Sequence, residues 1–110
     1  MLIGFVVNPV AGMGGAVGLK GTDGAVEEAR RRGAVPVAPN RARMLLSLIT
    51  PGVHTFLTAG GPMGEALLAE AGHPAEVVFV PDRTETTGED TRRACRAFAD
   101  RGCDLILFCG

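Results

Sequence analysis

The sequence lacks several features that would point to common functions. It has no tryptophan or tyrosine, two histidines and three cysteines, and Lys20 is its one lysine. An odd number of cysteines without C-x-x-C spacing predicts neither a disulfide framework nor a zinc site, so we expect three reduced, buried thiols. Neither histidine has another ligand at metal-binding spacing. A net charge of −1 with dispersed basic residues gives no reason to expect nucleic acid or anionic membrane as a partner.

Charge is also missing from residues 1–19. The segment is too rich in glycine for a membrane-spanning helix, and a positively charged start typical of a signal peptide is absent. We therefore expect a cytoplasmic protein. At 110 residues with 46% hydrophobic content, the chain can form one domain at most.

The residues present are organised around an apolar run at 2–7 that leads into a glycine-rich loop. Glycines without Cβ let successive backbone N–H groups approach an anion closely and form a concave phosphate site. Lys20 would contribute a compact positive charge to this phosphate site. The alternatives are an unstructured connection and a solvated lysine. The loop glycines that we select are Gly12, Gly14 and Gly15.

Two familiar phosphate fingerprints do not fit this loop. The dinucleotide pattern G-x-G-x-x-G fails because Gly12 and Gly14 are followed by Val17, and the P-loop pattern fails because Gly21 follows Lys20. The sequence therefore supports neither a dehydrogenase-type Rossmann domain nor a P-loop ATPase.

The rest of the chain alternates predicted strands and helices. Strands are expected at 54–58, 76–80 and 104–109, the last buried on both faces. Helices are expected at 24–32, at 41–49 with Asn40 at its start, from Pro62 to residue 71, and at 88–101. Thr87 and Asp90 form a T-x-x-D capping box for the last helix. All five phenylalanines are assigned to the core. This order predicts a three-layer α/β Rossmann-like domain with a mainly parallel four-stranded sheet.

Three blocks of the sequence resemble the ATP-NAD kinase family, within the NAD kinase and diacylglycerol kinase superfamily. The first begins at Asn8-Pro9 and runs through the glycine loop to Gly24, and the second is the glycine turn 60–65. The third, from Thr84 to Gly110, resembles the part of the family that precedes its G-G-D-G-T motif. The resemblance covers essentially the whole chain.

This resemblance implies an enzyme that transfers a phosphoryl group from ATP, with Mg2+, to NAD or a related alcohol. By analogy with doubly wound folds we expect strand order 3-2-1-4, with Asn8 and Gly110 facing each other where the order reverses. We expect residues 1–110 to be the N-terminal α/β domain, ending at the first glycine of G-G-D-G-T, so that the family's aspartate lies beyond it. Catalytic residues are then expected outside this stretch. The residues predicted to bind nucleotide are Asn8, Gly12, Gly14, Gly15, Lys20, Thr22, Asp23, Gly60, Gly61, Thr86 and Gly110.

Two further expectations follow. Thr87 should cap the last helix, whereas Thr84 and Thr86 lie after a strand and should contact ligand. Taken alone, these 110 residues should not phosphorylate a substrate, and exposure of the last strand should favour homo-oligomers. The competing interpretation is a non-catalytic nucleotide-binding or regulatory module.

Overall fold

The computed structural model describes residues 1–10, 37–82 and 86–109. A four-stranded, all-parallel sheet forms its centre, with strand order β3-β2-β1-β4. The strands are β1 (Leu2–Val7), β2 (Thr55–Ala59), β3 (Ala75–Phe79) and β4 (Leu105–Cys109). The predicted order is confirmed, and with it the α/β fold class.

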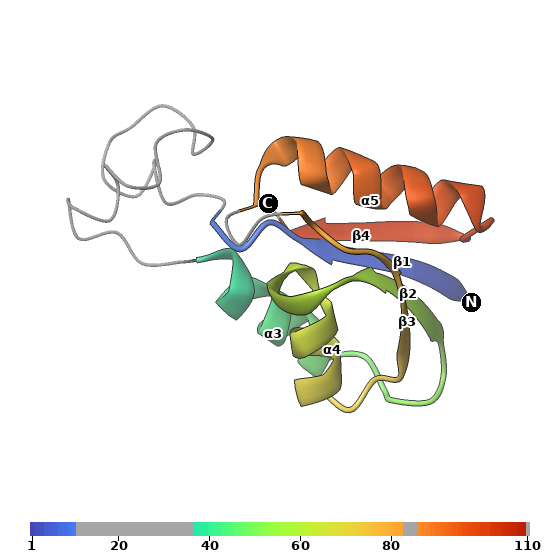
Figure 1. Cartoon of the computed structure of the whole chain (residues 1–110). Coiled ribbons are helices and arrows are strands. Elements are labelled where there is room, and N and C mark those ends of the chain that lie inside the picture. The colour runs from blue at the N-terminus through green and yellow to red at the C-terminus, as the bar shows by residue number, and fades with distance from the viewer. Residues whose placement is uncertain (11–36, 83–85, 110) are drawn as a thin grey trace.

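Helices cover both faces of the sheet, giving three layers (Figure 1). On one face, α3 (Ala38–Ser47) packs against β1 and β4, and α4 (Glu65–Glu70) packs against α3 and β3. On the other, α5 (Gly88–Asp100) crosses β1, β2 and β3. A short 3-10 helix, η1 (Gly61–Met63), precedes α4. The predicted helix at 24–32 lies outside the described residues.

Each face of the sheet has its own core, because alternate residues of a strand point to opposite faces. Ile3, Phe5 and Val7 of β1 point toward α3 and α4, where Ala42 and Leu46 of α3 are buried with them. Val6 points toward α5 and meets Ala94 and Phe98. The strand is therefore buried on both sides, as expected for the inner strand of a parallel sheet.

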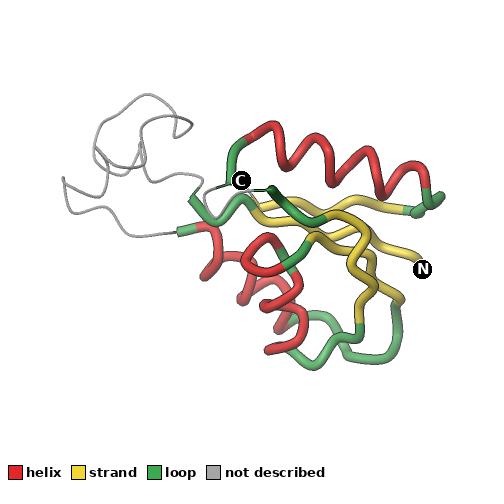
Figure 2. Tube along the Cα trace, viewed as in Figure 1, coloured by secondary structure: helices red, strands yellow, loops and turns green. Residues whose placement is uncertain are grey.

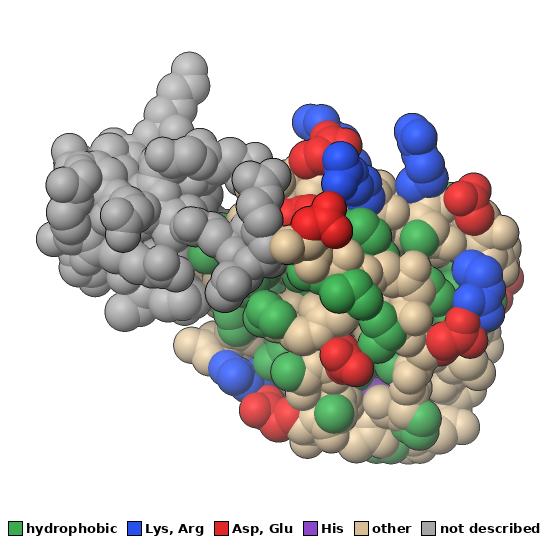
Figure 3. Space-filling model, in the orientation of Figure 1, with side chains coloured by type: hydrophobic (Ala, Val, Ile, Leu, Met, Phe, Trp, Pro, Cys, Tyr) green, Lys and Arg blue, Asp and Glu red, His purple; other side chains and the backbone are tan. Residues whose placement is uncertain are grey.

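Helix α5 begins and ends close to the prediction. Its N-cap is Thr87: the Thr87 hydroxyl accepts from the Asp90 N–H, and the Asp90 carboxylate accepts from the Thr87 N–H at 3.0 Å. Ala94 and Phe98 are buried, while Arg92 and Arg93 form ion pairs with Glu89 on the solvent side. Charged side chains accordingly gather along α5 at the upper edge of the molecule (Figure 3).

Two helix predictions were wrong in detail. The helix expected at 41–49 begins at Ala38, because Pro39 occupies the first turn, where its missing N–H has no intrahelical partner to lose. Asn40 is not the N-cap and instead accepts from the Arg43 guanidinium at 2.7 Å. The helix expected from Pro62 is interrupted at Gly64, which separates η1 from α4.

The prediction that β4 is buried on both faces was also wrong. Leu105 is 43% exposed and Phe108 66% exposed, so Phe108 is not a core residue. The reason is position: β4 is the last strand in the described sheet and has β1 as its one described neighbour. The three cysteines are unpaired and half-buried, where full burial was expected.

Candidate functional site

The carboxyl ends of the four parallel strands meet at one edge of the sheet, where α5 begins and the chain leads into α3 (Figures 1 and 2). Strand order reverses between β1 and β4, since β2 and β3 lie on one side of β1 and β4 on the other. In open parallel sheets, ligands bind beyond the carboxyl ends of the strands at this reversal. We call this region the carboxyl edge. It receives Asn8 after β1, Gly60 and Gly61 after β2, and Thr86 before α5.

Asn8 joins the two strands that flank the reversal. Its backbone N–H donates to the Cys109 carbonyl at 2.9 Å, and its side-chain Oδ1 accepts from the Val10 N–H at 3.2 Å. The second bond is the Asx type that stabilises a turn. Asn8 is only 9% exposed. Its backbone N–H and side-chain oxygen therefore already shape the turn that leaves β1.

The second glycine turn also has its amides occupied. The Gly60 N–H donates to the Phe79 carbonyl at 2.8 Å, which extends the β2–β3 pairing. The Gly61 N–H donates to Oε1 of Glu65 at 2.9 Å. A phosphate could bind the Gly61 amide only by displacing the Glu65 carboxylate. Sequence reasoning missed this role of Glu65, although a glutamate four residues after a glycine that starts a helix was the available signal.

Thr86 is the most informative of the predicted residues that the structure describes. Thr86 is 2% exposed, and its Oγ1 has no hydrogen-bond partner among the described residues, a property that it shares with His54 Nδ1 before β2 and Thr91 Oγ1 inside α5. An unpaired buried hydroxyl costs about 1–3 kcal/mol, so a group that bonded to it would recover free energy. In the neighbouring Thr87, by contrast, the hydroxyl and the backbone N–H both form hydrogen bonds with Asp90 in the capping box.

The position of Thr86 relative to β1 follows from the packing of α5. Gly4 lies under Phe98, because a Cβ built on Gly4 would be 2.5 Å from Phe98 Cδ2. From residue 98 back to residue 87, the helix travels about 16 Å toward its start. From residue 4 to residue 8, β1 travels about 13 Å. Since α5 starts at the carboxyl edge (Figure 1), its N-cap reaches nearly the same level as Asn8.

The start of α5 is not free to bind an anion. Glu89 and Asp90 occupy its first turn, and the Asp90 carboxylate already takes the Thr87 amide. Their negative charge compensates the positive end of the helix dipole. The hydroxyl of Thr86 is thus better suited to a neutral hydrogen-bonding group than to a phosphate at this end of the edge.

The remaining predicted residues lie outside the described part of the chain. These are Gly12, Gly14, Gly15, Lys20, Thr22, Asp23, Thr84 and Gly110. The predicted phosphate contact of the glycine loop and Lys20, and the facing of Asn8 and Gly110, therefore stay predictions. The structure brings Asn8, Gly60, Gly61 and Thr86 to one edge of the sheet.

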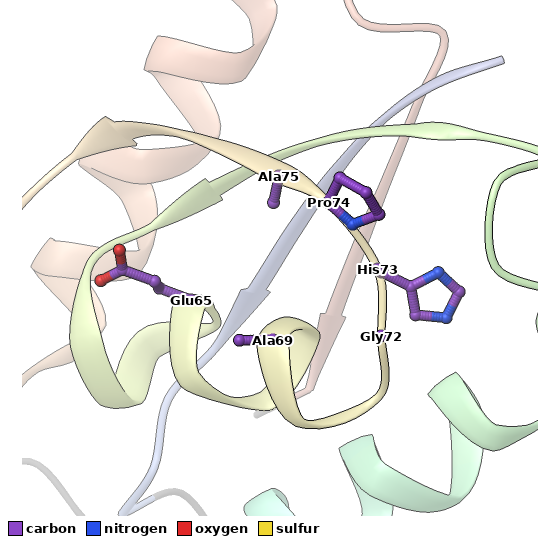
Figure 4. A pocket seen from close by; sticks show the side chains of 6 residues that line it. All are labelled: Glu65, Ala69, Gly72, His73, Pro74 and Ala75. Carbon is purple, nitrogen blue, oxygen red and sulfur yellow. The ribbon is translucent and has the colours of Figure 1, made fainter.

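A hollow between α4 and the start of β3 is lined by Glu65, Ala69, His73 and Ala75, among others (Figure 4). The His73 ring points away from this hollow. It is 3% exposed, packs edge-on against Phe56 with ring centroids 5.0 Å apart, and lies 3.4 Å from the Leu46 carbonyl. His73 is therefore a core residue and does not provide the hollow with a catalytic base.

Two of the cysteines are poor nucleophiles. Burial raises the pKa of the Cys95 and Cys109 thiols above the ordinary value, and nearby Cys103 adds to the effect at Cys95. Thiolate is the reactive form, so a higher pKa reduces reactivity at neutral pH.

The described ranges contain no group of three or more histidine, cysteine, aspartate or glutamate side chains that could hold a metal ion. No helix of residues 1–10, 37–82 and 86–109 has the length and apolar character needed to cross a bilayer.

The fold and the carboxyl edge define a doubly wound α/β domain of the nucleotide-binding type. A sequence model of the ATP-NAD kinase N-terminal domain matches residues 3–110. The chain belongs to the ATP-NAD kinase family, and the match covers its N-terminal domain. Searches of curated proteins and of solved structures gave no significant match.

Proposed function

We propose that residues 1–110 form the N-terminal nucleotide-binding domain of an ATP-dependent, NAD kinase-like enzyme. Such an enzyme moves a phosphoryl group from ATP, as its Mg2+ complex, to a hydroxyl of NAD or a related alcohol. The observation that carries the proposal is the family match over residues 3–110, and the Thr86 hydroxyl, buried at the carboxyl edge and unpaired among the described residues, supports it. Buried polar groups in proteins are nearly always paired, and a bound nucleotide would supply the partner.

The proposal divides the nucleotide between two sides of the carboxyl edge. We assign the phosphates to the segment that follows β1, because its sequence carries the glycines and Lys20. We assign a sugar hydroxyl or base nitrogen to Thr86, because the acidic first turn of α5 disfavours phosphate beside it. When bound, Mg2+ would neutralise phosphate charge, and we treat it as part of the ATP substrate.

We also propose that these residues do not transfer phosphate by themselves. Phosphoryl transfer needs a group that orients or deprotonates the attacking hydroxyl. Glu65 accepts from Gly61, Asp90 accepts from Thr87, and Asp104 accepts from the Leu2 N–H at 2.8 Å, at the opposite end of the sheet. Each of these carboxylates has a structural role. The engagement of these three carboxylates in structural hydrogen bonds also favours the second candidate function, a nucleotide-binding module without catalysis.

Thr86 and Thr87 provide a test of the binding proposal, because substitution of one should lower nucleotide affinity and substitution of the other should lower stability. Thr86→Val keeps the shape and removes the unpaired hydroxyl, so it should weaken nucleotide binding about ten-fold while leaving stability unchanged or slightly higher. Thr87→Ala removes the cap and should cost about 1 kcal/mol of stability with little change in affinity. Calorimetric titration with ATP and NAD, alongside urea unfolding, measures both quantities.

Lys20→Ala serves as the positive control in the same titrations. Loss of a charge-assisted bond of about 1.5–3 kcal/mol should weaken binding roughly ten- to a hundred-fold. If Thr86→Val and Lys20→Ala both bind ATP and NAD like the unchanged protein, the nucleotide-binding proposal is wrong.

The inactivity proposal is tested with an NADP-forming assay containing ATP, Mg2+ and NAD. The 110-residue protein should form no NADP, and a version extended through the gene's downstream sequence should form it if G-G-D-G-T follows. NADP formation by the 110-residue protein would overturn the proposal. Inactivity of an extended protein with an intact G-G-D-G-T would support a different acceptor, and absence of the motif would support the binding module.

A further inference from the structure

The capped start of α5 carries two threonines at positions that usually hold apolar side chains. With Thr87 as the N-cap, Thr86 is the residue before the cap and Thr91 is the fourth residue of the helix. In capped helices these two positions commonly carry apolar side chains that pack against each other. Here they place two hydroxyl groups beside each other instead. We call Thr86 and Thr91 the threonine pair.

Both hydroxyls of the threonine pair are buried, and neither has a hydrogen-bond partner among the described residues. A threonine inside a helix commonly donates from its hydroxyl to the carbonyl four residues earlier. For Thr91 that carbonyl belongs to Thr87, and it accepts the Thr91 backbone N–H at 3.4 Å. The Thr91 hydroxyl does not bond to it. It is therefore available, like the Thr86 hydroxyl, to a group from outside the helix.

The threonine pair lies where the apolar core under α5 ends. Thr91, Ala94 and Phe98 follow one another along one face of α5 at the spacing of a helical turn. Ala94 and Phe98 are buried in a cluster with Val6 of β1. Thr91 is one turn nearer than Ala94 to the carboxyl edge, because α5 starts at that edge (Figure 1). A ligand that enters from the carboxyl edge would meet two hydroxyls at the border of an apolar cluster.

We infer that the threonine pair binds the polar edge of the nucleotide base, with one hydroxyl bonded to each of two neighbouring polar atoms. This inference rests on the proposed nucleotide binding and extends it from Thr86 to Thr91. A base is favoured over a phosphate because Glu89 and Asp90 make the first turn of α5 negative. A base is favoured over a ribose because the adjoining cluster is apolar, and a flat aromatic ring gains free energy when it leaves water.

The chemistry of the threonine pair also predicts its selectivity. A threonine hydroxyl can donate or accept a hydrogen bond, and it rotates to suit its partner. The pair should therefore bind an amino group or a keto oxygen on the base equally well. It should disfavour a base that lacks both, because a buried hydroxyl is then left unpaired. The inferred site tolerates adenine and hypoxanthine alike but is sensitive to loss of the group at ring position 6.

Calorimetric titration of the 110-residue protein with a series of triphosphates measures this selectivity. ATP carries an amino group at ring position 6, inosine triphosphate a keto oxygen, and purine riboside triphosphate a hydrogen atom. ATP and inosine triphosphate should bind within about three-fold of each other, and purine riboside triphosphate about ten-fold more weakly. A preference of more than about ten-fold for ATP over inosine triphosphate would overturn the inference, because rotatable hydroxyls cannot produce it.

Variants assign the effect to the threonine pair. Thr91→Val removes the hydroxyl and keeps the shape, so it should weaken ATP binding about ten-fold and bring ATP and purine riboside triphosphate to nearly equal affinity. Thr91→Ser keeps the hydroxyl and should preserve the difference between the two ligands. Thr55→Val is the matched control: Thr55 is exposed at the start of β2, and its substitution should change no affinity. Circular dichroism and urea unfolding confirm that each variant is folded.

The outcomes separate this inference from the proposed function. If ATP binds and Thr91→Val changes neither its affinity nor the dependence on the base, the inference is wrong while nucleotide binding stands. If none of the triphosphates binds, both are wrong. Titration with 3′-deoxy-ATP detects a sugar contact. If Thr91→Val removes the effect of the missing sugar hydroxyl and not that of the missing base group, the pair binds ribose and the assignment to the base is overturned.

Discussion

Replacing Gly64 by alanine should destabilise the protein by about 3–5 kcal/mol, a large fraction of the stability of a domain of this size. Gly64 has φ of +153°, which side-chain-bearing residues rarely adopt. A Cβ at this position would overlap with Thr58 Oγ1 and lie 3.1 Å from the Phe5 carbonyl oxygen. Thr58 cannot easily move, because it is fully buried and its hydroxyl donates to that carbonyl at 2.8 Å.

Urea unfolding followed by circular dichroism measures the effect, with Gly52→Ala as the control. Gly52 also has positive φ, +86°, but a Cβ there would meet no atom within 4 Å. Its substitution should cost only the backbone strain, about 1–2 kcal/mol. Equal losses at the two positions would mean that crowding by Thr58 is not the cause.

Gly4→Ala should cost about 2–3 kcal/mol because it overfills the core between β1 and α5. The added Cβ would lie 2.5 Å from Cδ2 and 2.6 Å from Cγ of Phe98, a side chain with no exposed surface. The helix would have to move away from the sheet. Thermal and urea unfolding of the variant report the loss.

A double-mutant cycle with Phe98→Ala identifies the contact. Phe98→Ala alone should cost about 3–5 kcal/mol by leaving a cavity. In the double variant the new methyl group occupies part of that cavity, so the combined loss should be at least about 1 kcal/mol smaller than the sum. Additive losses would show that Gly4 and Phe98 do not interact.

The elements that sequence reasoning located best are those whose signals are local. The apolar run at 2–7 is β1 to the residue, and the start of α5 follows from Thr87 and Asp90, whose side chains each accept from the other's backbone N–H. The start of α3 was placed three residues too late, because Pro39 reads equally well as a connector or as part of a first helical turn.

Features that depend on distant neighbours could not be predicted. The apolar run of β4 by itself predicts a strand buried on both faces, and the expectation of an exposed last strand came from the family resemblance and not from this run. Nothing near Gly4 in the sequence shows that it makes room for Phe98. The strand order itself was inferred by analogy with doubly wound folds and is correct.

The candidate site was predicted in part. Sequence position placed Asn8, Gly60, Gly61 and Thr86 after strands, and parallel strands necessarily bring these positions to one edge. The competition at that edge was not foreseen: Glu65 already holds the Gly61 amide, and the first turn of α5 is already negative. The spacing of Glu65 from Gly61 and the predicted capping box at Asp90 were local signals for this competition, but that these carboxylates take the amides needed by a phosphate becomes clear only from the side-chain contacts.

The place of β1 in the sheet has a consequence for folding during synthesis. β1 is made first, yet its neighbours are β2 and β4, and the Leu2 N–H bonds to Asp104, 102 residues away. Contacts between the two ends of a chain form slowly, because a long loop must close before they gain any free energy. On the ribosome, β1 can pair with β2 early, but its other side must wait until β4 has emerged. During that time β1, an inner strand of the finished sheet, exposes unpaired backbone groups along one side. A chaperone that binds exposed strands would act at this stage.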